Sequence, residues 1–84
     1  MLTPIFSFES AKIKQISFHK SRHDLIAVAL FSGALHVLNF LTRRVVLTLQ
    51  ITPKSLRALD FHPTQQFLAT GGDDGALHLV DYLS

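Results

Sequence analysis

The chain contains no cysteine among its 84 residues. That absence excludes disulfide bonds and thiolate metal sites, and it favours a reducing compartment. Long apolar runs are also missing: the longest uninterrupted one, residues 25–31, is far below the roughly 18 residues that a membrane-spanning helix needs. The amino end has no charged region followed by an apolar core. We therefore expect a soluble chain without a targeting peptide.

Charge is sparse and unevenly distributed. Charged residues make up 17% of the chain and hydrophobic residues 48%, which favours a packed protein over a disordered one. Residues 1–58 hold all eight Lys and Arg with two acids, whereas residues 59–84 hold four acids and no base. The basic residues lie scattered between apolar stretches and do not interleave with aromatic residues as a nucleic-acid stacking groove requires. RNA or DNA binding is therefore not favoured.

Two short motifs occur twice in the same order. ISFH at residues 16–19 is answered by LDFH at residues 59–62, and GALH at residues 33–36 is repeated at residues 75–78. The two spacings are 43 and 42 positions, and the difference of one falls in the loop between the motifs. The chain therefore contains two copies of one sequence repeat.

Each copy consists of short runs rich in branched and aromatic residues, separated by polar or glycine-containing turns. Turn residues recur every few positions, and no apolar stripe with helical spacing persists, so helix is disfavoured. We predict strands over residues 13–18, 25–30, 35–40, 45–50, 56–61, 67–70 and 77–82. A period of about 40 to 45 residues with four strands is typical of a WD-type β-propeller blade.

The predicted fold is all-β, with two four-stranded antiparallel blades that form an incomplete β-propeller. We place repeat one at residues 9–50 and repeat two at residues 51–84, and we predict that residues 1–8 are the closing strand of a ring's last blade. Propellers close with about 4 to 8 blades, so two blades leave faces and strand edges open. We expect further blades, from this chain or from others, and an oligomeric or poorly soluble isolated chain.

The second repeat resembles the WD-repeat pattern in its LDFHP opening, its ATGG strand end, its Asp-Asp-Gly turn and its closing LHLVDY. It departs from that pattern because the chain has no tryptophan. The Trp-Asp pair appears as Leu-Asn at residues 38–39 and Val-Asp at residues 80–81, and Gly-His is replaced by Ile-Thr at residues 51–52. The Asp-His-Ser/Thr-Trp hydrogen-bond network of a standard blade is therefore incomplete.

Among WD-repeat proteins, the chain resembles the amino terminus of the coatomer (COPI) alpha-subunit family. The matching blocks are MLT at residues 1–3, FESAKIK at 8–14, SFH at 17–19, Arg57, DFH at 60–62 and GGDD at 71–74. The resemblance implies a non-enzymatic role in the COPI vesicle coat, in Golgi-to-ER retrieval of cargo with a carboxy-terminal dilysine signal. It implies partners in other blades or coat subunits, and a cytoplasmic location at Golgi membranes and COPI vesicles.

The same resemblance implies that Lys12, Lys14 and Arg57 bind the terminal carboxylate of the cargo. Lys12 stands where that family usually has arginine, so a forked grip is replaced by a point charge. Independently of the resemblance, Lys12 and Lys14 are two positions apart and point to one side of a strand. On the residues alone, solvated charges beside strand starts are the better explanation of all three, and only the resemblance makes the two explanations equal.

Two other classes of function stay open on the sequence. One is a generic WD-repeat scaffold in another assembly, for example in ribosome assembly, and the other is a small metal-dependent enzyme using the histidines with Asp73 and Asp74. The repeat already explains the histidines, because they occupy equivalent positions a blade apart. Asp73, Asp74 and Gly75 are typical of a structural turn in which glycine supplies a positive φ. We expect no metal and no cofactor.

Overall fold

The computed structural model describes residue 4, residues 6–8 and residues 12–83. Seven strands form two antiparallel sheets with meander order, β1-β2-β3-β4 and β5-β6-β7. The strands of the first sheet are β1 (Ile13–Phe18), β2 (Leu25–Leu30), β3 (Ala34–Asn39) and β4 (Arg44–Gln50). Those of the second are β5 (Leu56–Phe61), β6 (Phe67–Gly72) and β7 (Leu77–Asp81).

The all-β prediction is confirmed, and each predicted strand corresponds to a strand of the structure. The bounds of β1, β2 and β5 are those predicted; β4, β6 and β7 differ by one or two residues at one end, and β3 by one residue at both ends. The second sheet has three strands in the described part of the chain instead of the predicted four. The counterpart of β4 would begin five positions after the end of β7, which lies beyond Ser84.

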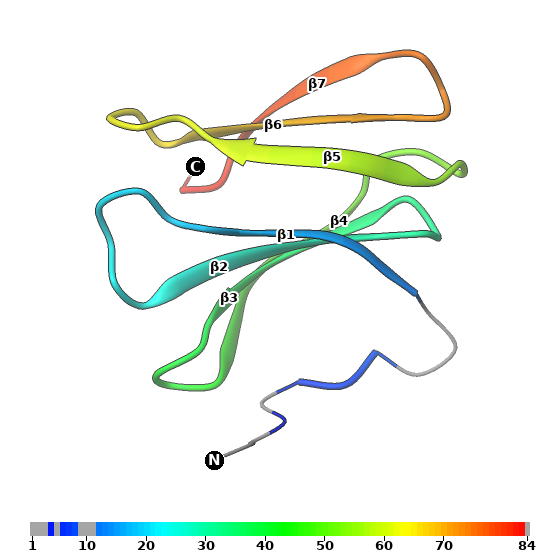
Figure 1. Ribbon diagram of the computed structural model, residues 1–84. Helices are drawn as coiled ribbons and strands as arrows, with labels where there is room; N and C mark the ends of the chain where they lie inside the picture. Colours follow the sequence, from blue (N-terminus) through cyan, green and yellow to red (C-terminus); the bar gives the residue numbers. More distant parts are fainter. Residues whose placement is uncertain (1–3, 5, 9–11, 84) are drawn as a thin grey trace.

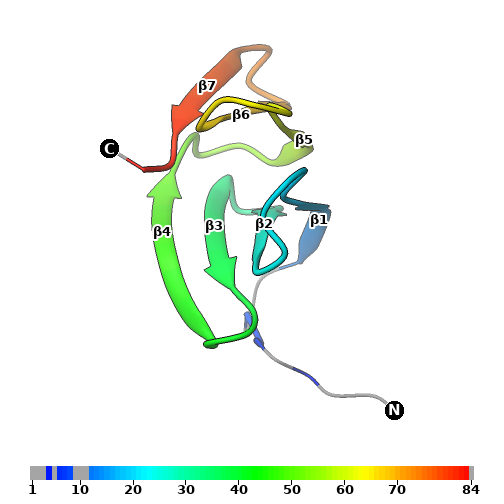
Figure 2. The same ribbon diagram turned by 90° about the vertical axis from the view of Figure 1, so that its left-hand side faces the viewer.

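The two sheets stack as neighbouring layers, with β1 beside β5 on one side and β4 near β7 on the other (Figures 1 and 2). Alternate residues of β2 and β3 point into the interface, because side chains alternate across a strand. Small residues on β2 let the second sheet approach closely, and large ones on that sheet fill the space. This core contains Leu25, Ala27, Ala29, Leu35 and Val37 from the first sheet, with Leu56, Leu59, Phe61, Leu68, Val80 and Tyr82 from the second segment.

The opposite face of the first sheet is partly covered by the amino-terminal segment. Phe6 and Phe8 pack against a second cluster of Val28, Leu30 and Leu38. The described residues of the predicted closing strand, residue 4 and residues 6–8, form no strand, and residues 1–3 and 5 lie outside the described part. Pairing of this segment with a last blade stays a prediction.

Two glycines leave room for the backbone of the connection between the sheets to pass close to the sheets. A Cβ on Gly33 would lie 1.8 Å from the carbonyl oxygen of Thr52, and one on Gly72 would lie 2.3 Å from that of Ser55. Backbone bonds fasten the connection at both ends, from Ile51 N–H to Gly33 O and from Asp73 N–H to Ser55 O. This close approach sets the spacing between the sheets.

The outer face of the second sheet is uncovered in the described part of the chain. Leu77 is 80% exposed and Leu79 is 68% exposed. Strand β7 is also an edge strand there. Among the described residues no helix has the length and apolarity needed to cross a membrane.

Candidate functional site

Basic side chains gather at the end of the sheets where β1 and β5 begin. The Nζ atoms of Lys12 and Lys14 lie 5.8 and 5.1 Å from the centroid of the Phe31 ring, which sits in the turn between β2 and β3. Both lysines are exposed, and Phe31 is half exposed. A cation over an exposed aromatic ring contributes about 0.5 to 1 kcal/mol. The two ammonium groups therefore share one weak partner and remain open to solvent.

Arg57 holds the position in the second repeat that is equivalent to Lys14, and it has a different partner. Its Nε–H donates to Asp73 Oδ1 at 3.1 Å, and its Nη2 donates to Oδ2 at 3.0 Å. The hydrogen bonds from Arg57 lower the pKa of Asp73, and the charges of Lys14 and Lys54 lower it further. The guanidinium predicted to bind an external carboxylate is thus engaged by a carboxylate of the chain itself.

The structure therefore brings Lys14 and Arg57 to one end of the molecule, around Asp73. Phe31 and Asp73 are the contacts that the sequence reasoning missed. The repeat register carries the signal for both, because Lys14 aligns with Arg57 and Phe31 with Asp73. Each repeat thus places a basic side chain of its first strand beside the turn between its second and third strands. Its partner there is the Phe31 ring in the first repeat and the Asp73 carboxylate in the second.

Asp74 and Gly75 form the turn between β6 and β7. Asp74 Oδ1 accepts the N–H of Ala76 at 3.0 Å, Asp74 Oδ2 lies 3.1 Å from His78 Nε2, and Gly75 has a φ of 75°. The bond from the Ala76 N–H is the main cause that lowers the pKa of Asp74. Asp74 is thus bound within its own turn.

His19 makes a polar contact between the two repeats. Its Nε2 lies 2.5 Å from the Tyr82 hydroxyl oxygen, and its Nδ1 accepts the N–H groups of Ser21 and Arg22 at 3.1 and 2.8 Å. Because Nδ1 accepts two backbone donors, the neutral ring carries its proton on Nε2 and donates it to Tyr82. Burial lowers the pKa of His19, nearby Arg22 lowers it further, and Asp24 opposes the shift.

The incomplete hydrogen-bond network leaves one buried hydroxyl of the second repeat without a partner among the described residues. That hydroxyl belongs to Thr70. Thr70 lies in β6 two positions from Leu68, which pairs with Val80 at the place of the missing tryptophan. An apolar valine cannot donate to the hydroxyl as an indole would.

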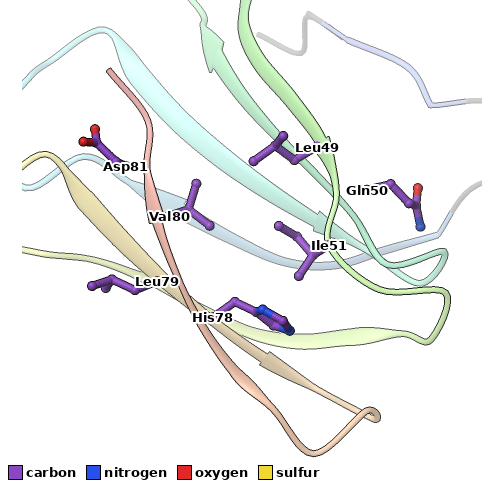
Figure 3. A pocket seen from close by; sticks show the side chains of 7 residues that line it. All are labelled: Leu49, Gln50, Ile51, His78, Leu79, Val80 and Asp81. Atoms are coloured by element: carbon purple, nitrogen blue, oxygen red, sulfur yellow. The ribbon is translucent and has the colours of Figure 1, made fainter. Parts of the chain in front are cut away.

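An open hollow of about 430 Å³ runs along β7. Figure 3 shows Leu49, Gln50 and Ile51 on one side and the side chains of β7 on the other. Its lining is mostly apolar, and it follows an edge strand. The hollow therefore suits an extended polypeptide better than a small reactive molecule. In the described part of the chain, no three His, Asp or Glu side chains lie where they could hold a metal ion.

Two antiparallel sheets stacked as repeats, with a charged end and no helix in the described chain, define the class of protein. It is a WD40-repeat segment of β-propeller fold, and such domains are generally scaffolds that bind other proteins. The chain belongs to the family of the anaphase-promoting complex subunit 4 WD40 domain, whose model matches residues 16–84.

Solved structures with the same fold include a chain of the mitotic checkpoint complex, with a TM-score of 0.78 and 17% identity. The match covers 90% of this chain and 22% of that chain. The computationally designed Ika4 protein is also similar, with a TM-score of 0.74, 18% identity and coverage of 94% and 48%. The present chain thus spans from about a fifth to about half of these proteins, and at such identity the likeness concerns the fold alone. No curated protein matches the chain in sequence.

Proposed function

We propose that the chain acts as a protein-interaction segment whose basic end binds a carboxylate of a partner protein. The observation that carries this proposal is the gathering of Lys14, Arg57 and Lys54 around Asp73, with Lys12 beside them over the Phe31 ring. This end is exposed and holds more cations than anions. A carboxylate approaching it gains charge-assisted hydrogen bonds, which are stronger than neutral ones.

The resemblance to the coatomer alpha-subunit family supports a specific ligand class, the carboxy-terminal dilysine tail of retrieval cargo. We propose that Lys12 and Lys14 hold the terminal carboxylate of such a tail. Arg57 joins them when the carboxylate displaces Asp73, because that ion pair is half exposed and exposed pairs contribute only about 0 to 1 kcal/mol. The proposed location is the cytoplasmic face of Golgi membranes and COPI vesicles.

Calorimetric titration with a dilysine peptide tests the proposal. We expect the free-acid peptide to bind and the same peptide with an amidated carboxyl end to bind about tenfold more weakly, because one charge-assisted bond is worth about 1.5 kcal/mol. Lys14→Ala should weaken binding by a similar factor. Equal affinity for the two peptides would contradict the proposal.

Two further variants separate the site from general basicity. Asp73→Asn removes the internal carboxylate that engages Arg57, so it should tighten binding of the free-acid peptide. Arg44→Ala removes an exposed basic residue at the start of β4, which lies at the other end of the first sheet, and should leave binding unchanged. A loss with Arg44→Ala equal to that with Lys14→Ala would show that net charge, rather than this site, attracts the peptide.

A second candidate function is supported by the family itself. The anaphase-promoting complex is a multi-subunit assembly, and a WD40 segment of its subunit 4 family suits a scaffold role in such an assembly, as it would in ribosome assembly. A scaffold of this kind binds folded surfaces, so it requires no free carboxyl end. Peptide binding that is absent or insensitive to amidation, together with binding to a subunit, would favour this candidate.

A further inference from the structure

The interface between the two sheets contains an aromatic pair that we call the plug. In the second repeat it is Phe61 with Tyr82, whose rings meet edge to face with centroids 5.4 Å apart. These residues are only 1% and 5% exposed. Phe61 also lies 5.0 Å from the ring of His19 on the first sheet. The plug of the second repeat is therefore seated in the first.

The first repeat carries the same pair at the equivalent positions, but in the described chain Phe18 is exposed and Phe40 is only partly buried. Phe18 and Phe40 meet edge to face with centroids 5.8 Å apart. Phe18 is nevertheless 60% exposed, whereas its counterpart Phe61 is buried. Phe6 and Phe8 cover a neighbouring cluster of this face and leave Phe18 open. The chain thus presents one plug that is not seated.

The second sheet carries an empty counterpart of the place that the seated plug fills. A hollow of about 230 Å³ on its outer face is lined by His62, Pro63, Phe67 and Leu79, among other residues, and we call it the socket. The repeat register aligns its lining residues His62, Phe67 and Leu79 with His19, Leu25 and Val37, which face the seated plug.

His62 has the same internal bonding as its counterpart. Its Nδ1 accepts the N–H groups of Thr64 and Gln65 at 3.1 and 3.0 Å, as His19 accepts those of Ser21 and Arg22. A neutral His62 therefore carries its proton on Nε2, the atom that His19 uses to contact Tyr82. No partner for this atom is present in the described part of the chain. The socket is built like the occupied site.

We propose that the chain associates head to tail with a second copy of itself, whose Phe18–Phe40 plug enters the socket. Plug and socket lie on opposite outer faces, so the contact is heterologous and each bound copy offers another socket. Charge favours this arrangement over contact between like faces. Residues 59–84 carry four acids and no Lys or Arg, and they meet the first repeat, which holds six of the eight Lys and Arg.

Sedimentation equilibrium of the full chain over a range of concentrations tests the proposal. We expect reversible association of the natural chain. Phe18→Glu in the plug and Leu79→Glu in the socket should each raise the dissociation constant about tenfold or more, because a carboxylate would be buried against an apolar face. A chain that stays monomeric at every concentration, or one whose association ignores both substitutions, would overturn the proposal.

Mixing the two variants identifies the kind of contact. Phe18→Glu keeps an intact socket and Leu79→Glu keeps an intact plug, so the mixture should form a one-to-one dimer and nothing larger. A mixture that stays monomeric would overturn the proposal. The matched control is Val46→Glu, since Val46 is an exposed apolar residue on β4 that lies outside plug and socket. It should leave association unchanged, and circular dichroism of all variants checks that they fold.

A gain of affinity tests the register. Phe40 aligns with Tyr82 but lacks the hydroxyl that His19 contacts. Phe40→Tyr should therefore place a hydroxyl at Nε2 of His62 in the second copy and tighten association about fivefold, as one neutral hydrogen bond does. Adding His62→Ala should remove that gain. An unchanged affinity in Phe40→Tyr would contradict the register of plug and socket.

Discussion

Equivalent residues of the two repeats keep a contact while its chemistry changes. Asn39 donates from its amide to Asp24, and in the second repeat the roles are exchanged, because Gln66 donates to Asp81. In each repeat the bond joins the residue just before the second strand to the last residue of the third strand. Geometry is thus conserved between the copies even where charge is not, which is why the register predicts a contact more safely than it predicts its polarity.

Gly33 gives a residue-scale prediction. Gly33→Ala should lower the free energy of unfolding by more than the 1 to 2 kcal/mol, roughly, that a positive φ costs an L-residue. The reason is that φ is 87° and the new Cβ would collide with the Thr52 carbonyl. Gly75→Ala is the control, since φ is 75° but no atom lies within 4 Å of its Cβ. Urea unfolding measures both, and equal losses would contradict the role given to close approach.

At the scale of elements, two strands with the same sequence role have different surroundings. Strand β5 is held between β6 and the first sheet, whereas the equivalent β1 has an exposed outer face. In β1, Ile13 is 54% exposed and Ile16 is 48% exposed. The apolar alternation of the two strands is similar, so their difference in burial comes from the order of stacking.

The matched positions Phe61 and Phe18 test that difference. Phe61→Ala should cost about 3 to 5 kcal/mol of unfolding free energy, because it empties a filled core. Since small domains are stable by only about 5 to 15 kcal/mol, this variant should lose a large share of its stability. Phe18→Ala at the equivalent exposed position should cost less than about 1 kcal/mol. Urea unfolding at low protein concentration gives both values, and equal costs would mean that the sheets do not pack as described.

At the scale of the whole molecule, stability depends on histidines that favour their neutral form. Burial lowers the pKa of His19 and of His36 below the ordinary value of 6.5. The unfolded chain therefore binds more protons near and below that pH. The free energy of unfolding should be highest above about pH 6.5 and should fall as the pH drops through 6.5. Protonation of Nδ1 in His19 would also remove the acceptor of two backbone N–H groups.

The urea midpoint measured against pH checks this prediction. We expect the midpoint to fall on acidification through pH 6.5, and we expect a shallower fall in His19→Gln. His23→Gln, at an exposed loop position, is the control and should keep the slope of the natural chain. A midpoint that is constant or rises on acidification would contradict the buried, neutral state of His19. A separate loss is expected in strong acid, below about 3.8, since the pKa values of Asp24, Asp73 and Asp74 are lowered in the folded state.

The sequence by itself determined the class of fold and placed each of the seven described strands to within two residues at its ends. Alternating apolar residues and turn residues such as Gly33 and Gly75 act locally, and each is readable within a few positions. The repeat register also aligned Lys14 with Arg57 before any contact was known. Local signals of this kind do not depend on how the sheets stack.

Only the tertiary structure decided which of two equivalent residues is buried and what each charged group contacts. Phe18 and Phe61 have the same local pattern, but Phe61 alone meets the opposing sheet. The contact of His19 with Tyr82 joins residues 63 positions apart, and Arg57 is engaged by Asp73 across two strands. Such partners are set by sheet stacking and strand register, which bring together groups that no local pattern connects.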